Sequence, residues 1–289
     1  MQAVLEVDNL CKQYPTFSLQ NVSFTLQKGS IMGFIGRNGA GKSTTLKSMV
    51  NMVHPTAGQV RYWGQDFTQN EFAIKQKIGF ALGGANYYQN KPLQAITGVY
   101  SRFYAQWQPD IYQNLIKRFE LNETKKVKEL SEGMKVKYAL ALALSHKAEI
   151  LLLDEPTSGL DPVSRDDLLE LFLDIAETGT SILFSTQITT DLERCADSIT
   201  YIKQGQLVTS STMQNLLQQY TVISGEATLL PACQKAGTLT GLRQRNGQLS
   251  AMVPASAAPT LPGLQTQPAS LEDIMIYTEK ENSNEKPAV

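Results

Sequence analysis

Short apolar runs alternate with amphipathic segments from the N-terminus to about Thr209. The apolar runs predict buried strands, because they are only five or six residues long and contain few polar side chains; they are Ser30–Ile35, Lys77–Leu82, Ile150–Glu155 and Ser181–Ser185. Apolar residues at helical spacing predict the helices between them; these are Thr45–Val53, Lys135–Ser145, Val163–Glu177 and Leu192–Ala196. This alternation predicts an α/β fold in which helices sandwich a parallel sheet.

Further strands are predicted on either side of this alternating region; they are Val4–Val7, Ser23–Leu26, Gln59–Trp63, Ser198–Ile202 and Gln206–Val208, the last two forming a hairpin. From about Pro92 to Arg118 the pattern is helical and rich in aromatic residues. Aromatic residues at such spacing usually belong to a core, but a dense cluster can also be a docking surface for a partner. The sequence leaves both interpretations open.

The composition changes after about Thr209, which predicts a boundary between a domain at 1–209 and an accessory segment at 210–289. Within the segment we expect a short helix, a small sheet with an Asn246-Gly247 turn and a closing helix; the ranges are Met213–Tyr220, then Tyr220–Ser224, Leu239–Arg245 and Gln248–Val253, then Leu271–Lys280. Pro254–Pro268 is rich in Pro, Ala, Ser and Thr, which predicts an exposed linker. Glu281–Val289 is predicted to be a frayed tail.

One loop carries a strong chemical signal. Its residues are Gly36, Arg37, Asn38, Gly39, Ala40, Gly41, Lys42, Ser43 and Thr44, which fit G-x-x-x-x-G-K-[ST] between a predicted strand and a predicted helix. The glycines let several backbone N–H groups point at one spot, at the positive end of the helix dipole, where a polyphosphate can bind. Lys42 adds a cation for the terminal phosphates, and the Ser43 hydroxyl is placed to ligate Mg²⁺. The loop therefore predicts nucleotide binding.

Two carboxylates end the most apolar of the predicted strands. Asp154 and Glu155 follow four consecutive aliphatic residues, a pattern typical of a central parallel strand covered on both faces. Carboxylates at that edge of an open α/β sheet face the crevice where ligands bind. Asp154 can hold Mg²⁺ through a water, and Glu155 can polarise an attacking water.

Two more candidates depend on context. Ser131 fits an N-cap, and Gly133 with the first N–H groups of the following helix forms a second potential anion site. Tyr14 lies upstream of the phosphate loop, where an aromatic ring can stack on a purine base. A capped helix and an aromatic residue at the core edge are the alternatives.

Charge and cysteine content exclude several classes of protein. The 289 residues carry a net charge of −1 without a block of lysine or arginine, which argues against a nucleic-acid-binding surface. Three distant cysteines indicate reduced thiols, and two histidines make a histidine metal cluster improbable. No signal peptide and no apolar run of roughly 18 residues is present, so we expect another chain to supply any membrane span.

Taken together, these motifs resemble the ATP-binding subunit of ABC transporters from about Val4 to Val208. The Gly36–Thr44 loop is similar to the Walker A motif of the family, LSEGM at Leu130–Met134 to its signature, LLLDEP at Leu151–Pro156 to its Walker B and SGLD at Ser158–Asp161 to its D-loop. More narrowly, the sequence resembles stand-alone ATPase chains of bacterial exporters for drugs and antimicrobial peptides. The resemblance implies a P-loop NTPase fold with a parallel core sheet, an antiparallel β subdomain, a helical subdomain at about 84–148 and a small C-terminal α+β extension.

The resemblance also implies a head-to-tail dimer that holds two ATP molecules with Mg²⁺. Each ATP would lie between the phosphate loop of one chain and Ser131 and Gly133 of the other, with Tyr14 stacked on adenine and Asp161 passing contacts across the interface. Closing and reopening of this dimer would drive a separate transmembrane permease subunit. The chain would then sit in the cytoplasm on the inner face of the cell membrane.

Two residues depart from the pattern of the family. Gly83 takes the place of a glutamine that senses the γ-phosphate and the metal, and Gln187 replaces the switch histidine. Glutamine can hydrogen-bond a phosphate, but it cannot carry a proton or a positive charge. Because Glu155 and Lys42 remain, we expect ATP hydrolysis that is slower than usual for the family but not lost.

The sequence therefore predicts an ATP-hydrolysing motor subunit of an ABC exporter. Three alternatives are a soluble ABC-type ATPase of DNA repair or ribosomes, a small-molecule kinase, and a regulatory module that binds ATP with little turnover. The first usually carries two cassettes, a coiled coil or basic patches, and the second has no use for LSEGM. Glu155 argues against the third.

Overall fold

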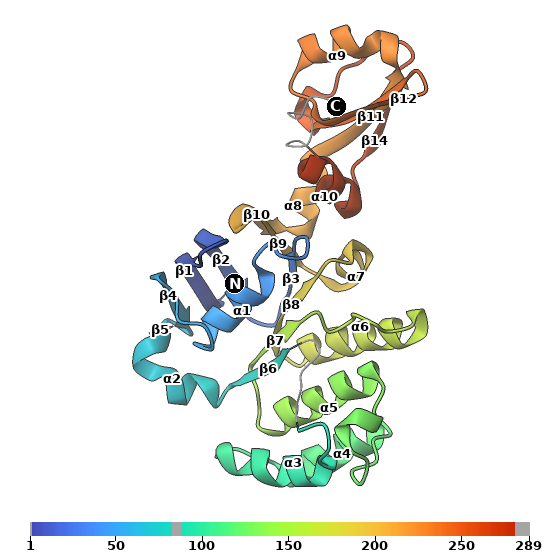
Figure 1. Cartoon of the computed structure of the whole chain (residues 1–289). Helices are drawn as coiled ribbons and strands as arrows, with labels where there is room; N and C mark the ends of the chain where they lie inside the picture. The colour runs from blue at the N-terminus through green and yellow to red at the C-terminus, as the bar shows by residue number, and fades with distance from the viewer. Residues whose placement is uncertain (1, 83–87, 281–289) are drawn as a thin grey trace. The chain divides into compact units, whose positions relative to one another are not determined.

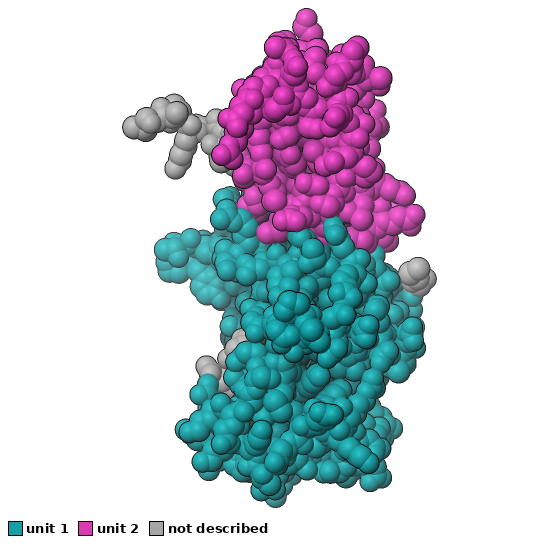
Figure 2. Space-filling view, turned by 90° about the vertical axis from the view of Figure 1, so that its right-hand side faces the viewer, with its two compact units in different colours: residues 1–210 teal, residues 211–289 magenta. Residues whose placement is uncertain are grey.

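The computed structural model describes residues 2–82 and 88–280. The chain forms two compact units, residues 1–210 and 211–289 (Figures 1 and 2). Each has its own sheet.

In the described part of unit 1, ten strands form one sheet in the order β5-β4-β1-β2-β10-β9-β3-β8-β7-β6. The strands are β1 (Ala3–Gln13), β2 (Ser18–Gln27), β3 (Ile31–Ile35), β4 (Ala57–Tyr62), β5 (Gln65–Asp66), β6 (Ile78–Leu82), β7 (Ile150–Asp154), β8 (Ser181–Thr186), β9 (Ser198–Lys203) and β10 (Gln206–Thr212). β9, β3, β8, β7 and β6 are parallel, whereas β1, β2, β4 and β5 pair antiparallel. The predicted parallel core and antiparallel part are confirmed.

Helices pack against this sheet (Figure 1). The helices of unit 1 are α1 (Lys42–Met49), α2 (Phe67–Lys75), α3 (Leu93–Tyr100), α4 (Pro109–Arg118), α5 (Glu132–Ser145), α6 (Pro162–Glu177) and α7 (Thr189–Cys195). α1 packs on β7, α5 on β6, and α6 on β3 and β8, whereas α3 and α4 lie further from the sheet, beyond α5 (Figure 1). Every residue of β3, β7 and β8 is buried, because a parallel strand between two layers of helices has no face left for solvent.

The register of the parallel strands aligns their carboxyl ends. Ile35 lies opposite Thr186, and Asp154 lies opposite Ser185. The residues that follow β3, β7 and β8 therefore emerge at one edge of the sheet, as the sequence predicts for the carboxylates after the aliphatic strand.

The aromatic region at 92–118 forms two helices, α3 and α4, joined by the 3₁₀ turn Ser101–Phe103. Tyr112 is buried, and the ring of Tyr104 stacks on His146 at a centroid distance of 3.7 Å. Phe103, by contrast, is 69% exposed. The cluster is thus partly core and partly accessible to solvent.

Unit 2 contains an antiparallel sheet in the order β12-β13-β11-β14. Its elements are α8 (Met213–Gln218), β11 (Tyr220–Glu226), α9 (Leu230–Ala236), β12 (Thr240–Arg245), β13 (Gln248–Pro254), β14 (Gln265–Pro268) and α10 (Leu271–Lys280). Asn246 and Gly247 join β12 to β13 with φ angles of 52° and 74°, as a two-residue hairpin turn requires. The small sheet and its Asn-Gly turn are confirmed.

Pro254–Pro268 is largely exposed, as predicted, but it is not a linker. Gln265–Pro268 pairs with β11 as strand β14, and Leu261 and Leu264 pack against a core that includes Ile223 and Cys233. Because the strand is only four residues long and all four are exposed, it leaves no apolar alternation in the sequence. Helices α2 and α9 are also absent from the prediction, and the predicted tail at 281–289 lies outside the described residues.

Candidate nucleotide-binding site

The phosphate loop connects β3 to α1, as its sequence predicts. A Cβ on Gly36 would lie 2.4 Å from the carbonyl oxygen of Ile202, so no larger residue fits there without moving backbone. Gly41 precedes α1 with a φ of 112°, in the region that favours glycine. These two glycines allow the loop to turn tightly and present the N-terminus of α1 to a ligand.

Lys42 extends back across the loop. Its side chain is 5% exposed, and its Nζ donates to the carbonyl oxygens of Gly36 at 2.7 Å and Arg37 at 3.4 Å. The same nitrogen forms an ion pair with Oε1 of Glu155 at 3.1 Å. The buried ammonium group is thus surrounded by oxygen acceptors, as a buried charge must be.

The two carboxylates after β7 have different environments. Asp154 is buried, and its Oδ1 accepts a 2.6 Å hydrogen bond from Oγ of Ser185 on the neighbouring strand. Glu155 donates its backbone N–H to the Ser185 carbonyl oxygen at 3.0 Å and has a φ of 50°. This left-handed conformation is uncommon for a residue other than glycine. It turns the chain so that the Glu155 side chain reaches Lys42.

Lys42 and Glu155 line one pocket of about 510 Å³. Its lining consists of Thr16, Phe17, Arg37, Asn38, Gly39, Gly41, Lys42, Ser43, Thr44 and Glu155. The Ser43 hydroxyl and the Asp154 carboxylate are oxygen donors of the kind that Mg²⁺ prefers. No cluster of three or more His, Cys, Asp or Glu side chains able to hold a metal occurs in residues 2–82 and 88–280.

Tyr14 lies in an adjoining pocket of about 470 Å³ with Gly39 and Gln204. Lys12 Nζ is 5.4 Å from the centre of the Tyr14 ring. Phe17 lines both pockets but is not among the predicted site residues. Its position three residues after Tyr14 in the same connection is the signal that could have identified it.

Ser131 and Gly133 lie apart from the phosphate loop. Ser131 is the N-cap of α5, since its Oγ accepts from the Met134 N–H at 3.2 Å, and the predicted cap is confirmed. Both residues line a separate pocket of about 210 Å³ together with Leu160 and Ser164. Within one chain, Ser131 and Gly133 therefore do not line the pocket of the phosphate loop.

Asp161 caps the helix α6. Its Oδ1 accepts from the N–H groups of Val163 and Ser164, both at 3.0 Å, and its Oδ2 accepts from the Ser164 hydroxyl at 2.6 Å. These hydrogen bonds, the one from the Ser164 side chain most of all, hold the Asp161 pKa below its ordinary value. The carboxylate is therefore charged throughout the neutral range.

Comparisons with known proteins agree with this geometry. A family model described as ABC transporter matches residues 19–158. The ABC transporter ATP-binding protein YtrB of Bacillus subtilis (strain 168) is 32% identical over 206 residues, which cover 71% of this chain and 70% of that protein. The bacitracin transport ATP-binding protein BcrA of Bacillus licheniformis is 31% identical over 212 residues, covering 72% and 69%.

This chain belongs to the ABC transporter ATP-binding subunits. A solved structure described as the ATP binding subunit of an ABC transporter is 26% identical, with a TM-score of 0.67 over 75% of this chain and 92% of that one. The protein is accordingly an ATPase whose turnover is coupled to transport. Subunits of this family dimerise and work with a membrane permease.

Of the two departures from the family pattern, Gln187 lies among the described residues and Gly83 does not. Gln187 of this ABC ATPase is exposed and lies between β8 and α7, where the Ile188 N–H donates to Thr186 Oγ1 at 3.0 Å.

The three cysteines of the ABC ATPase do not line the phosphate-loop pocket. Cys11, Cys195 and Cys233 are free thiols, and burial raises the pKa of Cys195 to about 12. A thiol with that pKa stays protonated and unreactive.

No helix in the described ranges 2–82 and 88–280 is long and apolar enough to span a bilayer.

Proposed function

We propose that Glu155 is the general base of ATP hydrolysis and that Lys42 binds the terminal phosphates of ATP. The observation that carries this proposal is the 3.1 Å distance between Lys42 Nζ and Glu155 Oε1 within the phosphate-loop pocket. A carboxylate at this position can accept a proton from a water that attacks the γ-phosphate. The backbone N–H groups of residues 36–44 would hold the β- and γ-phosphates.

Mg²⁺ would be held by the Ser43 hydroxyl, by Asp154 through a water and by phosphate oxygens of ATP. The short hydrogen bond from Ser185 Oγ to Asp154 Oδ1 fixes the carboxylate at the carboxyl edge of the sheet. When bound, the ion neutralises charge that develops on the phosphates. Gln187 would reach the γ-phosphate as a neutral hydrogen-bonding group.

ATP would be sandwiched in a head-to-tail dimer with a second copy or a related chain. The separate location of Ser131 and Gly133 supports this arrangement, because the pocket that they line does not include the phosphate loop of the same chain. A helix N-terminus with a free face is suited to the γ-phosphate of an ATP bound by the partner. Asp161 would lie near the dimer interface.

The motor would act on a separate permease at the inner face of the cell membrane and would power export. It would dock through the segment after Leu82 and the aromatic helical region, where Val99 and Phe103 are more than half exposed. A relative named for bacitracin transport favours an antimicrobial peptide or a similar compound as cargo. We assign residues 1–209 to the ATPase domain, with a helical subdomain at about 84–148, and residues 210–289 to an accessory role in regulation or dimer contact.

The test compares ATP turnover of the purified chain with that of Glu155→Gln. We expect Mg²⁺-dependent hydrolysis in the parent, a loss of roughly 100-fold or more in the variant and an ATP-trapped dimer of the variant on gel filtration. Glu149→Gln is the matched control, because Glu149 immediately precedes the same strand but pairs at the surface with Lys77. Tight ATP binding without turnover or dimer in either protein would favour the ATP-binding regulatory module.

A further inference from the structure

Helix α7 contains a buried carboxyl group that the mechanism above does not use. Asp191 in α7 is 2% exposed, and burial raises its pKa above the ordinary value. Its Oδ1 lies 3.9 Å from Nε of Arg165 in α6, and its Oδ2 has no hydrogen-bond partner among the described residues. A buried carboxyl with an unpartnered oxygen is costly to keep, which calls for a functional explanation.

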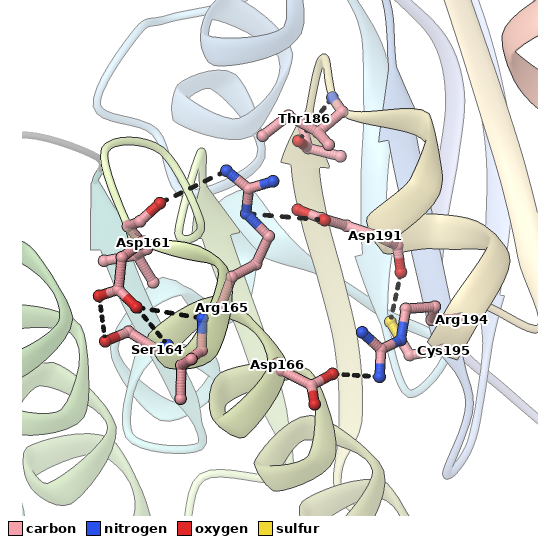
Figure 3. A network of polar contacts seen from close by, with 11 residues as sticks. Asp161, Ser164, Arg165, Asp166, Thr186, Asp191, Arg194 and Cys195 are labelled. Atoms are coloured by element: carbon pink, nitrogen blue, oxygen red, sulfur yellow. Dashed lines mark hydrogen bonds and ion pairs between the residues drawn. The ribbon is translucent and has the colours of Figure 1, made fainter.

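Arg165 connects this carboxyl to the turn after Glu155. Its Nη2 donates to the carbonyl oxygen of Leu160 at 3.5 Å, immediately before Asp161 (Figure 3). Thr157, in the same turn, is fully buried, and its hydroxyl favours the ionised form of Asp191. That hydroxyl has no partner of standard hydrogen-bond geometry among the described residues. The turn at 156–161 thus reaches Asp191 directly through the incompletely bonded Thr157 hydroxyl, and indirectly through Arg165 of α6.

Asp191 is also close in sequence to the turn that carries Gln187. α7 begins at Thr189, two residues after Gln187, and its N-cap Ile188 bonds to Thr186 at the end of β8 (Figure 3). A side chain fixed on the first turns of this short helix therefore fixes where the Gln187 turn lies. The Arg165–Asp191 contact is the polar link between the turn that follows Glu155 and the turn that carries Gln187.

We propose that Arg165 and Asp191 are positioning residues that hold the turn at 156–161 and the Gln187 turn in one arrangement during ATP hydrolysis. The proposal rests on the roles proposed above for Glu155 and Gln187. The weak bonds of the link, at 3.9 Å and 3.5 Å, leave room for a tighter arrangement in which Thr157 and the free Asp191 oxygen also pair. The catalytic groups would then be held more rigidly than the separate turns allow, which favours turnover more than binding.

The chain offers a matched control for this link. Arg194 and Asp166 join the same two helices through an ion pair, but their side chains are 56% and 41% exposed (Figure 3). Among the described residues, neither side chain forms a hydrogen bond or ion pair with the turn at 156–161. Asp166→Asn removes an exposed α6–α7 ion pair, and Asp191→Asn removes the buried one with the same change of chemistry. A difference in turnover between the two variants therefore reports the specific contribution of the buried ion pair.

The experiment measures steady-state ATP turnover for the parent, Asp191→Asn, Asp191→Glu, Arg165→Lys and Asp166→Asn. We expect Asp191→Asn and Arg165→Lys to lower kcat roughly 10- to 100-fold, as a small misplacement of catalytic groups does, with KM for ATP within about twofold. Asp191→Glu, which keeps the charge and adds reach across the 3.9 Å separation, should retain most of the parent kcat. Equal losses in Asp191→Asn and Asp166→Asn, or an unchanged kcat in Asp191→Asn, would overturn the proposal.

A second readout needs no turnover and separates this proposal from the roles of Glu155 and Gln187. Amide hydrogen exchange in segments 156–161 and 186–191 should accelerate about tenfold in Asp191→Asn and stay at the parent rate in Asp166→Asn. If Glu155→Gln leaves turnover unchanged while this exchange pattern appears, the assignment of the base fails and the link stands. Unchanged exchange in both segments would refute the link whatever the turnover.

Discussion

Lys42 and Glu155 share a partly buried ion pair, 3.1 Å from Nζ to Oε1, at the phosphate loop. Phosphate oxygens of ATP would compete with this carboxylate for the ammonium group. The pair therefore predicts that the two residues are coupled energetically, so that the effect of removing one depends on whether the other is present.

Lys42→Met should weaken ATP binding roughly 10- to 100-fold, because a charge-assisted hydrogen bond is lost and the Glu155 carboxylate is left unpaired beside the phosphates. Adding Glu155→Gln to Lys42→Met should recover part of the affinity, since the unpaired negative charge is removed. Equilibrium binding of a fluorescent ATP analogue measures both effects. Lys47→Met, one turn further along α1, is the control; additive effects in the double variant would contradict the coupling.

Gln187→His should raise the ATPase rate several-fold, because an imidazole can carry a proton and a positive charge near the γ-phosphate. The side chain is exposed between β8 and α7, so the replacement has room and the fold should be unaffected. Turnover is compared with the parent and with Gln214→His in unit 2. A rate equal to or below that of the parent would count against the view that glutamine slows this site.

Tyr14 and Phe17 are the two candidates for the residue that stacks on the adenine base. Tyr14→Ala should weaken ATP binding by about 1–3 kcal/mol, as the loss of an aromatic stacking partner does, and leave binding of inorganic triphosphate unchanged. Phe17 lines the phosphate-loop pocket itself, so Phe17→Ala should affect both ligands. If only Phe17→Ala selectively weakens ATP relative to triphosphate, the assignment of the stacking residue moves from Tyr14 to Phe17.

Much of the site was predictable because its residues are consecutive or follow a buried strand. The loop at 36–44, the carboxylates after β7 and the Ser131 cap depend on local spacing, and the structure places each where that spacing predicts. The parallel register then brings Glu155 to Lys42, although more than one hundred residues separate them. The fold and the ion pair follow from the same strand order.

Other features depend on tertiary contacts that leave no local signal. Strand β14 is short, polar and exposed, and it forms only because β11 offers an edge. Nothing in the local sequence distinguishes Phe17 or Asp191 from other aromatic or acidic residues. Only the fold places Phe17 beside the phosphate loop and Asp191 beside α6. Burial of a single side chain cannot be read from residue type alone.

His146 should make the stability of the protein fall in mild acid. The imidazole is 1% exposed, its Nδ1 lies 3.1 Å from the Gln76 carbonyl oxygen, and its Nε2 has no hydrogen-bond partner in the part of the chain that the structure describes. Burial lowers the pKa from 6.5 to about 4. Between these values the unfolded chain binds more protons, so this contribution is complete above pH 6.5 and is lost as the pH falls through about 4.

The difference in pKa corresponds to roughly 3 kcal/mol at most, since one pH unit is worth about 1.4 kcal/mol. Urea unfolding at pH 7 and pH 4.5 measures it in the parent and in His146→Asn, which removes the titrating group. The loss between the two pH values should be smaller in the variant. His54→Asn, an exposed histidine, should behave as the parent; equal pH dependence in all three proteins would exclude His146 as the cause.

Glycine replacements at two positions should change stability in opposite directions. A Cβ on Gly79 in β6 would lie 2.5 Å from Ala143 Cβ of α5 and 2.6 Å from Leu151 Cδ2 of β7, so Gly79→Ala should destabilise the fold by about 1–3 kcal/mol through overpacking. Gly98 in α3 has no heavy atom within 4 Å of its ideal Cβ among the described residues. Gly98→Ala should therefore stabilise by up to about 1 kcal/mol, the difference in helix propensity. Urea denaturation of both variants gives the two signs, and a neutral or stabilising Gly79→Ala would mean that α5 can move away from the sheet at little cost.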